Sequence, residues 1–479
     1  MRTGDESLTR RSARELVALM QSRQASPLEV LEAHLSVIAR LNPRLNAIVT
    51  LAAESVRQQA RAAEAALMRG EGLGPLGGLP IAIKDLTPTA GIRTTYGSTL
   101  YSEHVPDEDA EIVQRLKSAG AIVLGKSNTP EFGAGAHTVN AVFGVTRNPW
   151  NDALSPAGSS GGSAAAVASG MAALAHGTDF GGSVRVPAAF CGIVGIRPTP
   201  GLTPNHPGPL AWDFGQVHGP LARTAEDAAL MLDAMIGLSR SSPISVAPPW
   251  SSALTEVERC ADARGLRVAY ARDITGLGVD PEIEAICRAA ALSLQGRGAH
   301  VEEIAFDASD GRAAYQAWRG AWMVGRQYTR LSRLQELGTN LRGNVEAGLK
   351  VTTLELAAAE EKREEVFHRF RRLFEQYDVL LTPAAPVKPF SVEMSFPAEI
   401  NGRKLDNYID WIACAYLITL VSLPAASVPA GLTHDGLPVG LQVVAPRFEE
   451  PRILSVAKLV QQSNSIGWPP ARAEPSCTG

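Results

Sequence analysis

Two glycine-rich turns on either side of a helix of very small residues constrain this chain more than any other feature. The first turn, AGSSGGS, covers residues 157–163, and the second, TDFGGS, covers residues 178–183. Glycine lets the backbone turn tightly and approach its neighbours because it has no Cβ. The pattern therefore places two serines, Ser159 and Ser183, in tightly packed turns at the two ends of one helix.

A lysine in an apolar strand is the third informative feature. Lys84 ends the run IAIK at residues 81–84 and is followed by Asp85. A single lysine after a strand is more often paired with a carboxylate, and Asp85 is the obvious partner. In an apolar strand, however, the low dielectric disfavours the charged ammonium, so the neutral amine becomes accessible as a base. Together with two hydroxyls in glycine turns, such a lysine indicates nucleophilic catalysis.

The order of apolar runs indicates an α/β fold. Between residues 79 and 235 short apolar runs alternate with helices of small residues, including one expected over residues 163–175. This alternation is typical of helices that cover a parallel or mixed sheet. A Pro- and Ser-rich linker is expected at 239–252, a strand–helix–strand unit follows it, and strands near the C-terminus complete the sheet. We predict one large mixed central sheet with helices on both faces.

Residues 158–192 follow one ordered pattern: GSSGGS, a helix of small residues, and GTDFGGSVRVPAAFCG. Over this stretch the chain resembles the amidase signature family of serine hydrolases, whose pattern is G-[GA]-S-S-G-G-S followed by G-T-D-x-G-G-S-[IV]-R-x-P-A-x-[FY]-C-G. Further matches occur in order along most of the chain, at residues 78–80, 125–132, 146–150, 219–224 and 423–429. The resemblance implies a Ser-Ser-Lys amidase with the amidase signature fold.

The resemblance also implies a role for each of three residues. By motif position Ser183 is the acylated nucleophile, Ser159 is the bridging serine and Lys84 is the base. A neutral Lys84 takes a proton from Ser159, which takes one from Ser183, because an alkoxide forms at neutral pH only through a positioned relay. In the family the bridging serine lies on a cis peptide bond. Asp179 and Arg185 bracket the nucleophile, and we expect them to hold its turn in place.

The second glycine turn is expected to bind the oxyanion. Its candidate donors are the backbone N–H groups of Phe180, Gly181, Gly182 and Ser183, since glycine lets the main chain approach the substrate. The family usually has a smaller or β-branched residue at the position of Phe180. This difference points to an apolar or aromatic group in the substrate.

The family-like elements extend over most of the chain, so we predict a single amidase signature domain covering residues 1–479. Within it, residues 1–70 are expected to form a helical segment packed on the core. Residues 240–376 match the family less closely and are expected to shape the substrate pocket. Residues 464–479, rich in Pro, Ala and Ser, are expected to form a flexible tail.

Charge, cysteines and histidines exclude several classes of protein. The formal charge of −4 and the absence of a basic stripe argue against nucleic acid or an anionic membrane as a partner. The five cysteines are scattered, and the nine histidines show no metal-binding spacing, which argues against a disulfide framework or a zinc site. No apolar run is long enough for a signal peptide or membrane span. We expect a cytoplasmic enzyme without cofactor or metal that acts on a small-molecule amide. The sequence does not decide whether the enzyme forms a homodimer.

Three other motifs fit known patterns but stand in the wrong context. Residues 120–127 satisfy the phosphate-loop pattern, yet their middle residues are apolar and indicate a strand. Residues 72–77 fit the dinucleotide fingerprint, but they follow a helical pattern and include Pro75, which has no N–H. Residues 158–162 fit the nucleophile elbow of α/β-hydrolases without the strand that must precede it.

The leading hypothesis is an amide hydrolase that forms an acyl-enzyme on Ser183 and releases an amine or ammonia. The alternative is the amidase-type subunit of a glutamyl-tRNA(Gln) amidotransferase, which releases ammonia from glutamine and works with partner chains. In that relative a carboxylate helps to bind glutamine. By an approximate alignment Ile412 stands in its place, with Asp410 two positions away and Arg363 at the basic counterpart. Ester hydrolysis by the same relay stays open, whereas an inactive binding protein is disfavoured because the whole relay is present.

Aromatic residues favour an aryl amide or anilide as the substrate. The residues that suggest it are Phe180, Trp212 and Phe214. Three more aromatic residues fall at helical spacings further along the chain: Trp318, Trp322 and Tyr328. These three either line the pocket or, as is commoner for an aromatic stripe on a helix, belong to the core.

Overall fold

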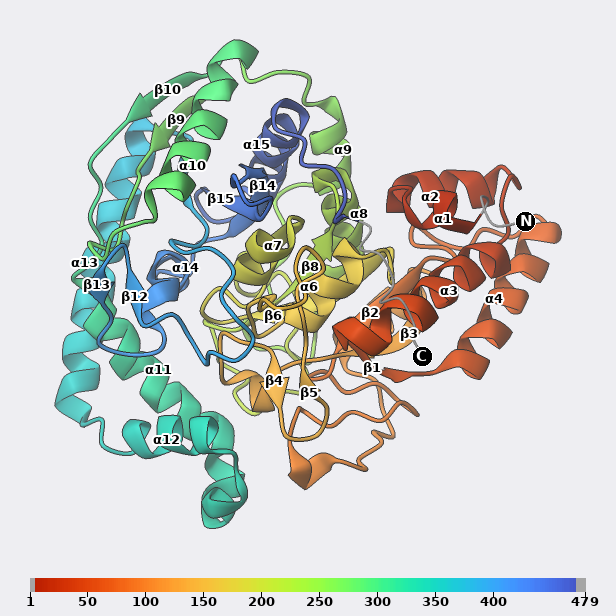
Figure 1. The fold of residues 1–479 in the computed structure, drawn as a ribbon, viewed down its shortest axis with the longest axis horizontal. Helices are drawn as coiled ribbons and strands as arrows, with labels where there is room; N and C mark the ends of the chain where they lie inside the picture. The colour runs from red at the N-terminus through yellow and green to blue at the C-terminus, as the bar shows by residue number, and fades with distance from the viewer. Residues whose placement is uncertain (1–4, 471–479) are drawn as a thin grey trace, which may run out of the picture.

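One sheet of 11 strands runs through the molecule, a computed structural model that describes residues 5–470 (Figure 1). The strands of this sheet and of two small sheets are, in chain order, β1 (Ile48–Leu51), β2 (Pro80–Lys84), β3 (Ile122–Ser127), β4 (Val139–Asn140), β5 (Gly144–Val145), β6 (Leu174–Asp179), β7 (Val194–Arg197), β8 (Val217–Ala222), β9 (Arg267–Tyr270), β10 (His300–Glu303), β11 (Val379–Pro383), β12 (Glu399–Ile400), β13 (Arg403–Lys404), β14 (Ala425–Leu432) and β15 (Pro438–Val444). Their order in the sheet is β1-β3-β2-β6-β8-β7-β14-β15-β11-β9-β10. The pairs β4–β5 and β12–β13 form two separate small sheets.

The sheet is mixed, as predicted. β2 pairs in parallel with both β3 and β6, and β9 pairs in parallel with both β10 and β11. The remaining neighbours are antiparallel. Because β2 and β6 are parallel neighbours, their carboxyl ends lie at the same edge of the sheet, which is where Lys84 and Asp179 end these strands.

Helices cover both faces of this sheet. The helices are α1 (Asp5–Thr9), α2 (Ala13–Gln21), α3 (Pro27–Leu45), α4 (Ala53–Met68), α5 (Glu111–Ser118), α6 (Gly161–Ala168), α7 (Arg185–Cys191), α8 (Ala225–Met235), α9 (Ala253–Arg259), α10 (Pro281–Ser293), α11 (Gly311–Gln327), α12 (Thr339–Gly348), α13 (Thr353–Gln376), α14 (Ala413–Leu420) and α15 (Glu450–Ser463). Successive strand residues enter different hydrophobic clusters: Ile81 and Ile83 pack with α5 and α8, whereas Ala82 packs with α3 and α6. The predicted α/β fold with both faces covered is therefore confirmed.

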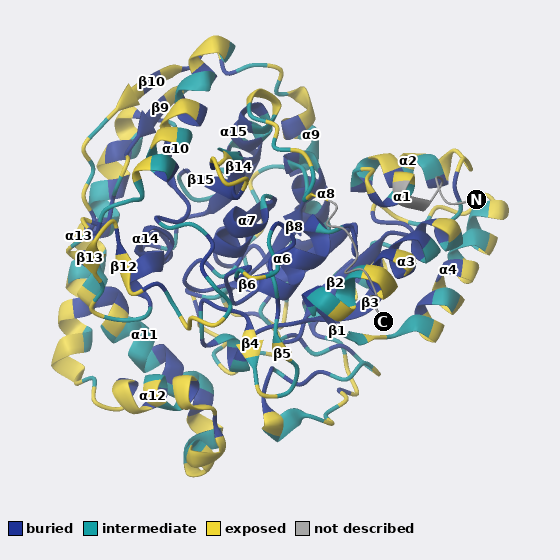
Figure 2. Cartoon of the chain, in the orientation of Figure 1, coloured by how far each residue is buried: buried dark blue, intermediate teal, exposed yellow. Residues whose placement is uncertain are grey.

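The innermost helices are the ones made of small residues. Every residue of α6 and α7 is buried, and Figure 2 shows both helices dark blue, whereas α12 and α13 carry exposed residues on their outer sides. Gly162 shows why α6 needs such residues, because a Cβ placed there would lie 2.3 Å from the backbone nitrogen of Asn128. The Gly- and Ala-rich composition thus lets α6 lie directly against the backbone at the end of β3.

Two expected elements differ in the structure. The helix expected over residues 163–175 ends at Ala168, because Gly170 takes a φ of +75°, and residues 174–179 form β6 instead. Within the N-terminal segment expected to be helical, Ile48–Leu51 forms β1, which pairs with β3 at the edge of the sheet. β-Branched residues favour this extended edge strand.

The phosphate-loop-like motif is a strand, as its apolar residues predict. Its residues 122–127 form β3 and are all buried. The amine of Lys126 donates to the carbonyl of Thr87 and, at 2.8 Å, to Thr89 Oγ1. This lysine therefore serves a turn of the fold and has no phosphate to bind.

The division of the chain into parts stays a prediction. Helices α1–α4 lie within the expected N-terminal segment, and α11–α13 lie within residues 240–376. Residues 471–479 of the expected tail lie outside the described residues. Among the helices of residues 5–470, none is both long enough and apolar enough to cross a membrane.

Candidate active site

Lys84 is a buried amine surrounded by hydroxyls. It ends β2, and its side chain has no exposed surface. Its Nζ lies 2.6 Å from Ser159 Oγ, 2.8 Å from Ser160 Oγ and 2.9 Å from Thr178 Oγ1. Among the described residues no carboxylate forms an ion pair with it. The adjacent Asp85 instead accepts hydrogen bonds from the backbone and hydroxyl of Thr95.

The surroundings of Lys84 favour its neutral form. Burial lowers the pKa of Lys84 well below its ordinary value, because the ammonium loses its hydration. The charge of Asp179 opposes this change in pKa, and the charge of Arg326 adds to it. The site therefore holds an amine that can accept a proton from the hydroxyl beside it.

Ser159 lies between Lys84 and the cavity. The peptide bond between Gly158 and Ser159 is cis, as the family resemblance implies, and the Ser159 side chain is almost fully buried. Ser159 and Ser183 line the same cavity, of about 40 Å³, which we call the serine cavity. The structure thus brings all three predicted relay residues to one place.

Ser183 follows β6 in the second glycine turn and is half-buried. Its carbonyl accepts a hydrogen bond of 3.1 Å from the backbone nitrogen of Ser160, which ties the two serine turns together. In the described part of the chain no hydrogen bond joins the Ser183 hydroxyl to Ser159. The first link of the relay, from Lys84 to Ser159, is therefore formed in this structure, and the second is not.

A buried ion pair holds the turn that carries Ser183. Arg185 donates to both carboxylate oxygens of Asp179, at 2.8 and 3.1 Å. It also donates to the carbonyl of Ala415 and to the side chains of Thr419 and Gln442. Burial alone would raise the pKa of Asp179, but Arg185 and Arg197 outweigh it and hold that pKa well below its usual range. Asp179 is therefore ionised, and the pair joins the turn to α14 and β15.

The same carboxylate changes the predicted oxyanion hole. The N–H of Gly182 donates to Asp179 Oδ1 at 2.9 Å, so this group already has an acceptor. The backbone nitrogens of Gly181 and Ser183 have no acceptor among the described residues, and both residues line the serine cavity together with Phe180. The set of candidate donors is therefore Phe180, Gly181 and Ser183, and Gly182 serves the turn.

The wall of the serine cavity is aromatic. Phe180 and Trp322 both line it, with ring centroids 3.9 Å apart in a stacked arrangement. Trp318 lies behind Phe180 at 5.0 Å and does not line the cavity. Tyr328 is 73% exposed and lies away from the cavity. Of the three aromatic residues Trp318, Trp322 and Tyr328, Trp322 is thus the one that lines the serine cavity.

Two aromatic residues that suggested an aryl substrate lie elsewhere. Trp212 and Phe214 are 73% and 43% exposed, and neither lines the serine cavity. Their loop folds outward because Asp213 between them points inward, where it accepts hydrogen bonds from Trp322 Nε1 and the backbone of Gly215. The argument for an aromatic wall therefore depends on Phe180 and Trp322.

Ile412 lines the serine cavity, whereas the two charged residues considered with it do not. Asp410 is buried and lies 3.5 Å from the hydroxyl of Tyr416. Arg363 packs over the Trp318 ring at 4.4 Å and also donates to the carbonyl of Leu420. The wall of the cavity is apolar at the position that the alternative function would give to a carboxylate.

Sequence reasoning missed three residues of the site. No role is assigned to Ser160 or Thr178 from the sequence, yet both accept hydrogen bonds from Lys84. The parallel pairing of β2 and β6 would reveal Thr178, but strand order is not visible in one sequence. Arg319, the one charged residue that lines the serine cavity, comes from α11 and matches no motif.

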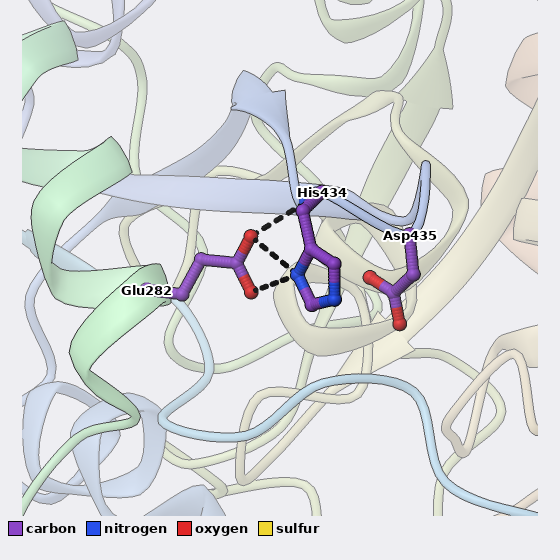
Figure 3. Close-up of side chains that lie close together, drawn as sticks. All are labelled: Glu282, His434 and Asp435. Atoms are coloured by element: carbon purple, nitrogen blue, oxygen red, sulfur yellow. Dashed lines mark hydrogen bonds and ion pairs between the residues drawn. The ribbon is translucent and has the colours of Figure 1, made fainter.

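One surface group resembles a metal site. Glu282, His434 and Asp435 approach one another, and Figure 3 shows His434 directed at the Glu282 carboxylate, 3.0 Å away. Lys388 forms an ion pair with Glu282 and lowers its pKa to about 2. None of these residues lines the serine cavity. Ion pairing at the surface explains the group.

None of the four cysteines within residues 5–470 lines the serine cavity. All four are free thiols: Cys191, Cys260, Cys287 and Cys414. Cys477 lies outside the described residues. Burial raises the pKa of Cys191, so the thiol next to the signature motif stays protonated and behaves as a small apolar side chain.

Comparison with known proteins identifies the family of this chain. The sequence model of the Amidase family matches residues 29–454. The acylamidase of Rhodococcus erythropolis is 36% identical over 460 residues, which cover 93% of this chain and 94% of that protein. A glutamyl-tRNA(Gln) amidotransferase subunit from Methylococcus capsulatus is 36% identical over 490 residues, covering 95% and 97%.

The solved structures agree. A bacterial aryl acylamidase of the amidase signature family superposes with a TM-score of 0.87 at 29% identity, covering 95% of this chain and 96% of that one. A 6-aminohexanoate cyclic dimer hydrolase gives a TM-score of 0.83 at 28% identity, covering 95% and 97%. The predicted resemblance is confirmed: the chain belongs to the amidase signature family and is a hydrolase of the carbon–nitrogen bond in amides.

Proposed function

We propose that this amidase cleaves its substrate through an acyl-enzyme on Ser183, with Ser159 and Lys84 as the proton relay. The observation that carries the proposal is the buried Lys84 amine, 2.6 Å from Ser159 Oγ and without a carboxylate partner in the described chain. A lysine paired with a carboxylate would stay protonated and could not act as a base.

The chemistry follows from this arrangement. Lys84 takes the Ser159 proton while Ser159 takes the Ser183 proton, and Ser183 Oγ forms a bond to the carbonyl carbon. The N–H groups of Gly181 and Ser183, with that of Phe180, receive the resulting oxyanion. The relay then donates the proton to the nitrogen of the scissile amide, the carbon–nitrogen bond breaks and the product amine leaves. Water then attacks the acyl carbon while the relay takes one of its protons. The ester bond to Ser183 breaks, the relay returns the proton to Ser183 Oγ, and a carboxylic acid is released.

An aryl amide or anilide is the substrate class we favour. The stacked rings of Phe180 and Trp322 form an aromatic wall, and Ile412 adds apolar surface to it. The similarity to an aryl acylamidase supports the same choice. We also place the enzyme in the cytoplasm, because its four described cysteines are all free thiols. The formal charge of −4 and the absence of a basic stripe in the sequence favour a small-molecule substrate over nucleic acid.

The alternative is release of ammonia from glutamine as one component of an amidotransferase. Similarity to a glutamyl-tRNA(Gln) amidotransferase subunit favours it. The apolar Ile412 in the cavity wall speaks against it, because the charged ammonium of glutamine would have no partner there.

A hydrolysis screen separates the two functions. We expect the purified chain to release 4-nitroaniline from 4-nitroacetanilide and to release almost no ammonia from glutamine. The Lys84→Ala protein measured in parallel gives the background. Efficient ammonia release from glutamine without anilide cleavage would favour the amidotransferase instead.

The activity should rise with pH at values well below those where a free lysine titrates. Only neutral Lys84 can accept a proton, so kcat/KM should increase as the amine loses its proton and then level off. Because burial lowers the pKa of Lys84 from 10.5, the plateau should begin below that value. The measurement is kcat/KM for 4-nitroacetanilide against pH.

Arg326 provides the variant for this profile, since its charge helps to lower the pKa of Lys84. Arg326→Gln should move the rise to higher pH, whereas Arg342→Gln, which alters a charge on α12 outside the serine cavity, should not. A flat wild-type profile from neutral to alkaline pH would count against a lysine base.

A further inference from the structure

Arg319 is the one charged side chain among the described residues that line the serine cavity. It projects from α11, the same helix that supplies Trp322. Its guanidinium donates to Tyr408 Oη and to Asn344 Oδ1, both at 2.5 Å. Both acceptors are neutral, and in the described part of the chain no carboxylate pairs with Arg319. A positive charge therefore faces the reaction site without a protein counter-charge.

Two further arginines add positive charge next to Arg319: Arg326 in α11 and Arg330 just beyond the end of this helix. Arg326 donates to the side chain of Gln216, which also lines the serine cavity, and Arg330 donates to the hydroxyl of Tyr101. Neither arginine forms an ion pair with a described residue. Asp213 is the carboxylate whose charge acts on Arg326. It is buried, accepts a hydrogen bond from Trp322 Nε1 and does not line the cavity.

Arg319 also stands at a junction between two cavities. A second cavity of about 680 Å³, which we call the helical pocket, lies between α11, α12 and α13. Its lining includes several Ala and Gly residues, and Asp310, Glu355 and Lys362 also line it. Arg319, Tyr408 and Ile409 line both the serine cavity and the helical pocket. The serine cavity, at about 40 Å³, holds little beyond the reacting group. Another cavity of about 590 Å³ also shares lining residues with the serine cavity, namely Gly135, Ala136 and Tyr408. A substrate that extends into the helical pocket, however, lies against Arg319.

We propose that the natural substrate is an amide carrying a carboxylate, which binds Arg319 at this junction while the amide carbon lies at Ser183. This inference rests on the proposed function and adds the charge of the substrate to it. A guanidinium has five N–H donors, so one that binds Tyr408 and Asn344 keeps donors in the planar arrangement that a carboxylate accepts. The apolar body of the substrate then lies in the helical pocket or packs against the aromatic rings of Phe180 and Trp322.

Matched substrates test this proposal. N-succinyl-4-nitroaniline and its methyl ester share the anilide and differ only in the charge of the acyl side. 4-Acetamidobenzoate and its methyl ester share the acetamide group and differ only in the charge of the amine side. We expect wild-type kcat/KM for amide cleavage to favour the acid over its ester by about 10- to 100-fold in at least one pair, the range of a charge-assisted hydrogen bond. Arg319→Gln should bring this ratio close to one.

Two further variants sharpen the test. Arg319→Lys keeps the charge but loses the planar fork, so it should retain part of the preference. Arg342→Gln removes a positive charge from α12 outside both cavities and should keep the wild-type ratio. Should Arg319→Gln melt at a much lower temperature than the wild type, the ratio in Arg319→Lys decides.

Different failures have different meanings. A wild type that cleaves neutral anilides but shows no preference for either acid overturns the role of Arg319. An acid preference that survives unchanged in both Arg319 variants overturns it as well. A wild type that cleaves none of the amides, 4-nitroacetanilide included, refutes the proposed function and this inference with it.

Discussion

Ser183→Ala and Lys84→Met should each lower kcat for anilide hydrolysis on the order of 10⁴-fold or more, because the members of a catalytic relay act as a unit. Ser183→Ala removes the atom that forms the acyl bond. Lys84→Met keeps most of the buried stem and removes the amine that lies 2.6 Å from Ser159 Oγ. Ser159→Ala should also be severely impaired, since it removes the hydroxyl that lies 2.6 Å from the Lys84 amine and lines the serine cavity with Ser183.

The readout should separate chemistry from folding. A fluorophosphonate label, detected by mass spectrometry, should add once to the wild type at Ser183, much more slowly to Lys84→Met and not at this position in Ser183→Ala. Ser169→Ala and Lys350→Ala are matched controls, because Ser169 bonds only to carbonyls of its own helix and Lys350 is exposed. A Ser183→Ala or Lys84→Met enzyme with the melting temperature and the activity of the wild type would refute the assigned roles.

The three residues that we propose for the relay can be picked out from the sequence because they lie in short contiguous motifs. Ser159 and Ser183 stand in glycine turns separated by α6 and β6, and Lys84 ends an apolar strand. The alternation of apolar runs likewise predicts a mixed sheet with both faces covered. Local patterns carry these features, so one chain is enough to find them.

The parts that the sequence does not predict depend on contacts between distant segments. Arg319 reaches the serine cavity only because α11 packs against the turn at Phe180, and no periodicity in the helix marks which arginine faces inward. The engagement of Gly182 by Asp179 depends on the geometry of the turn. The outward position of Trp212 depends on the inward Asp213 beside it, a choice that composition alone does not make.

Arg185→Met should lower the free energy of unfolding by about 3–5 kcal/mol, the usual cost of removing one member of a buried ion pair. Asp179 keeps only the longer contact with Arg197, at 3.6 Å. Arg185 and Asp179 are both fully buried, and the guanidinium also binds Ala415, Thr419 and Gln442. Without it, Asp179 no longer holds the N–H of Gly182 in a fixed turn. Activity should therefore fall together with stability. Urea unfolding followed by fluorescence gives the first quantity and kcat gives the second.

A double variant distinguishes an ion pair from simple loss of packing. Replacing both partners, as Asp179→Leu with Arg185→Met, removes both charges, so it should be less destabilised than the sum of the two single variants. Arg371→Met breaks the exposed pair with Glu375 on α13 and serves as the control, with an unfolding midpoint close to that of the wild type. If Arg185→Met unfolds at the same urea concentration as this control, the pair does not hold the turn, and the position of Ser183 must depend on the glycine backbone alone.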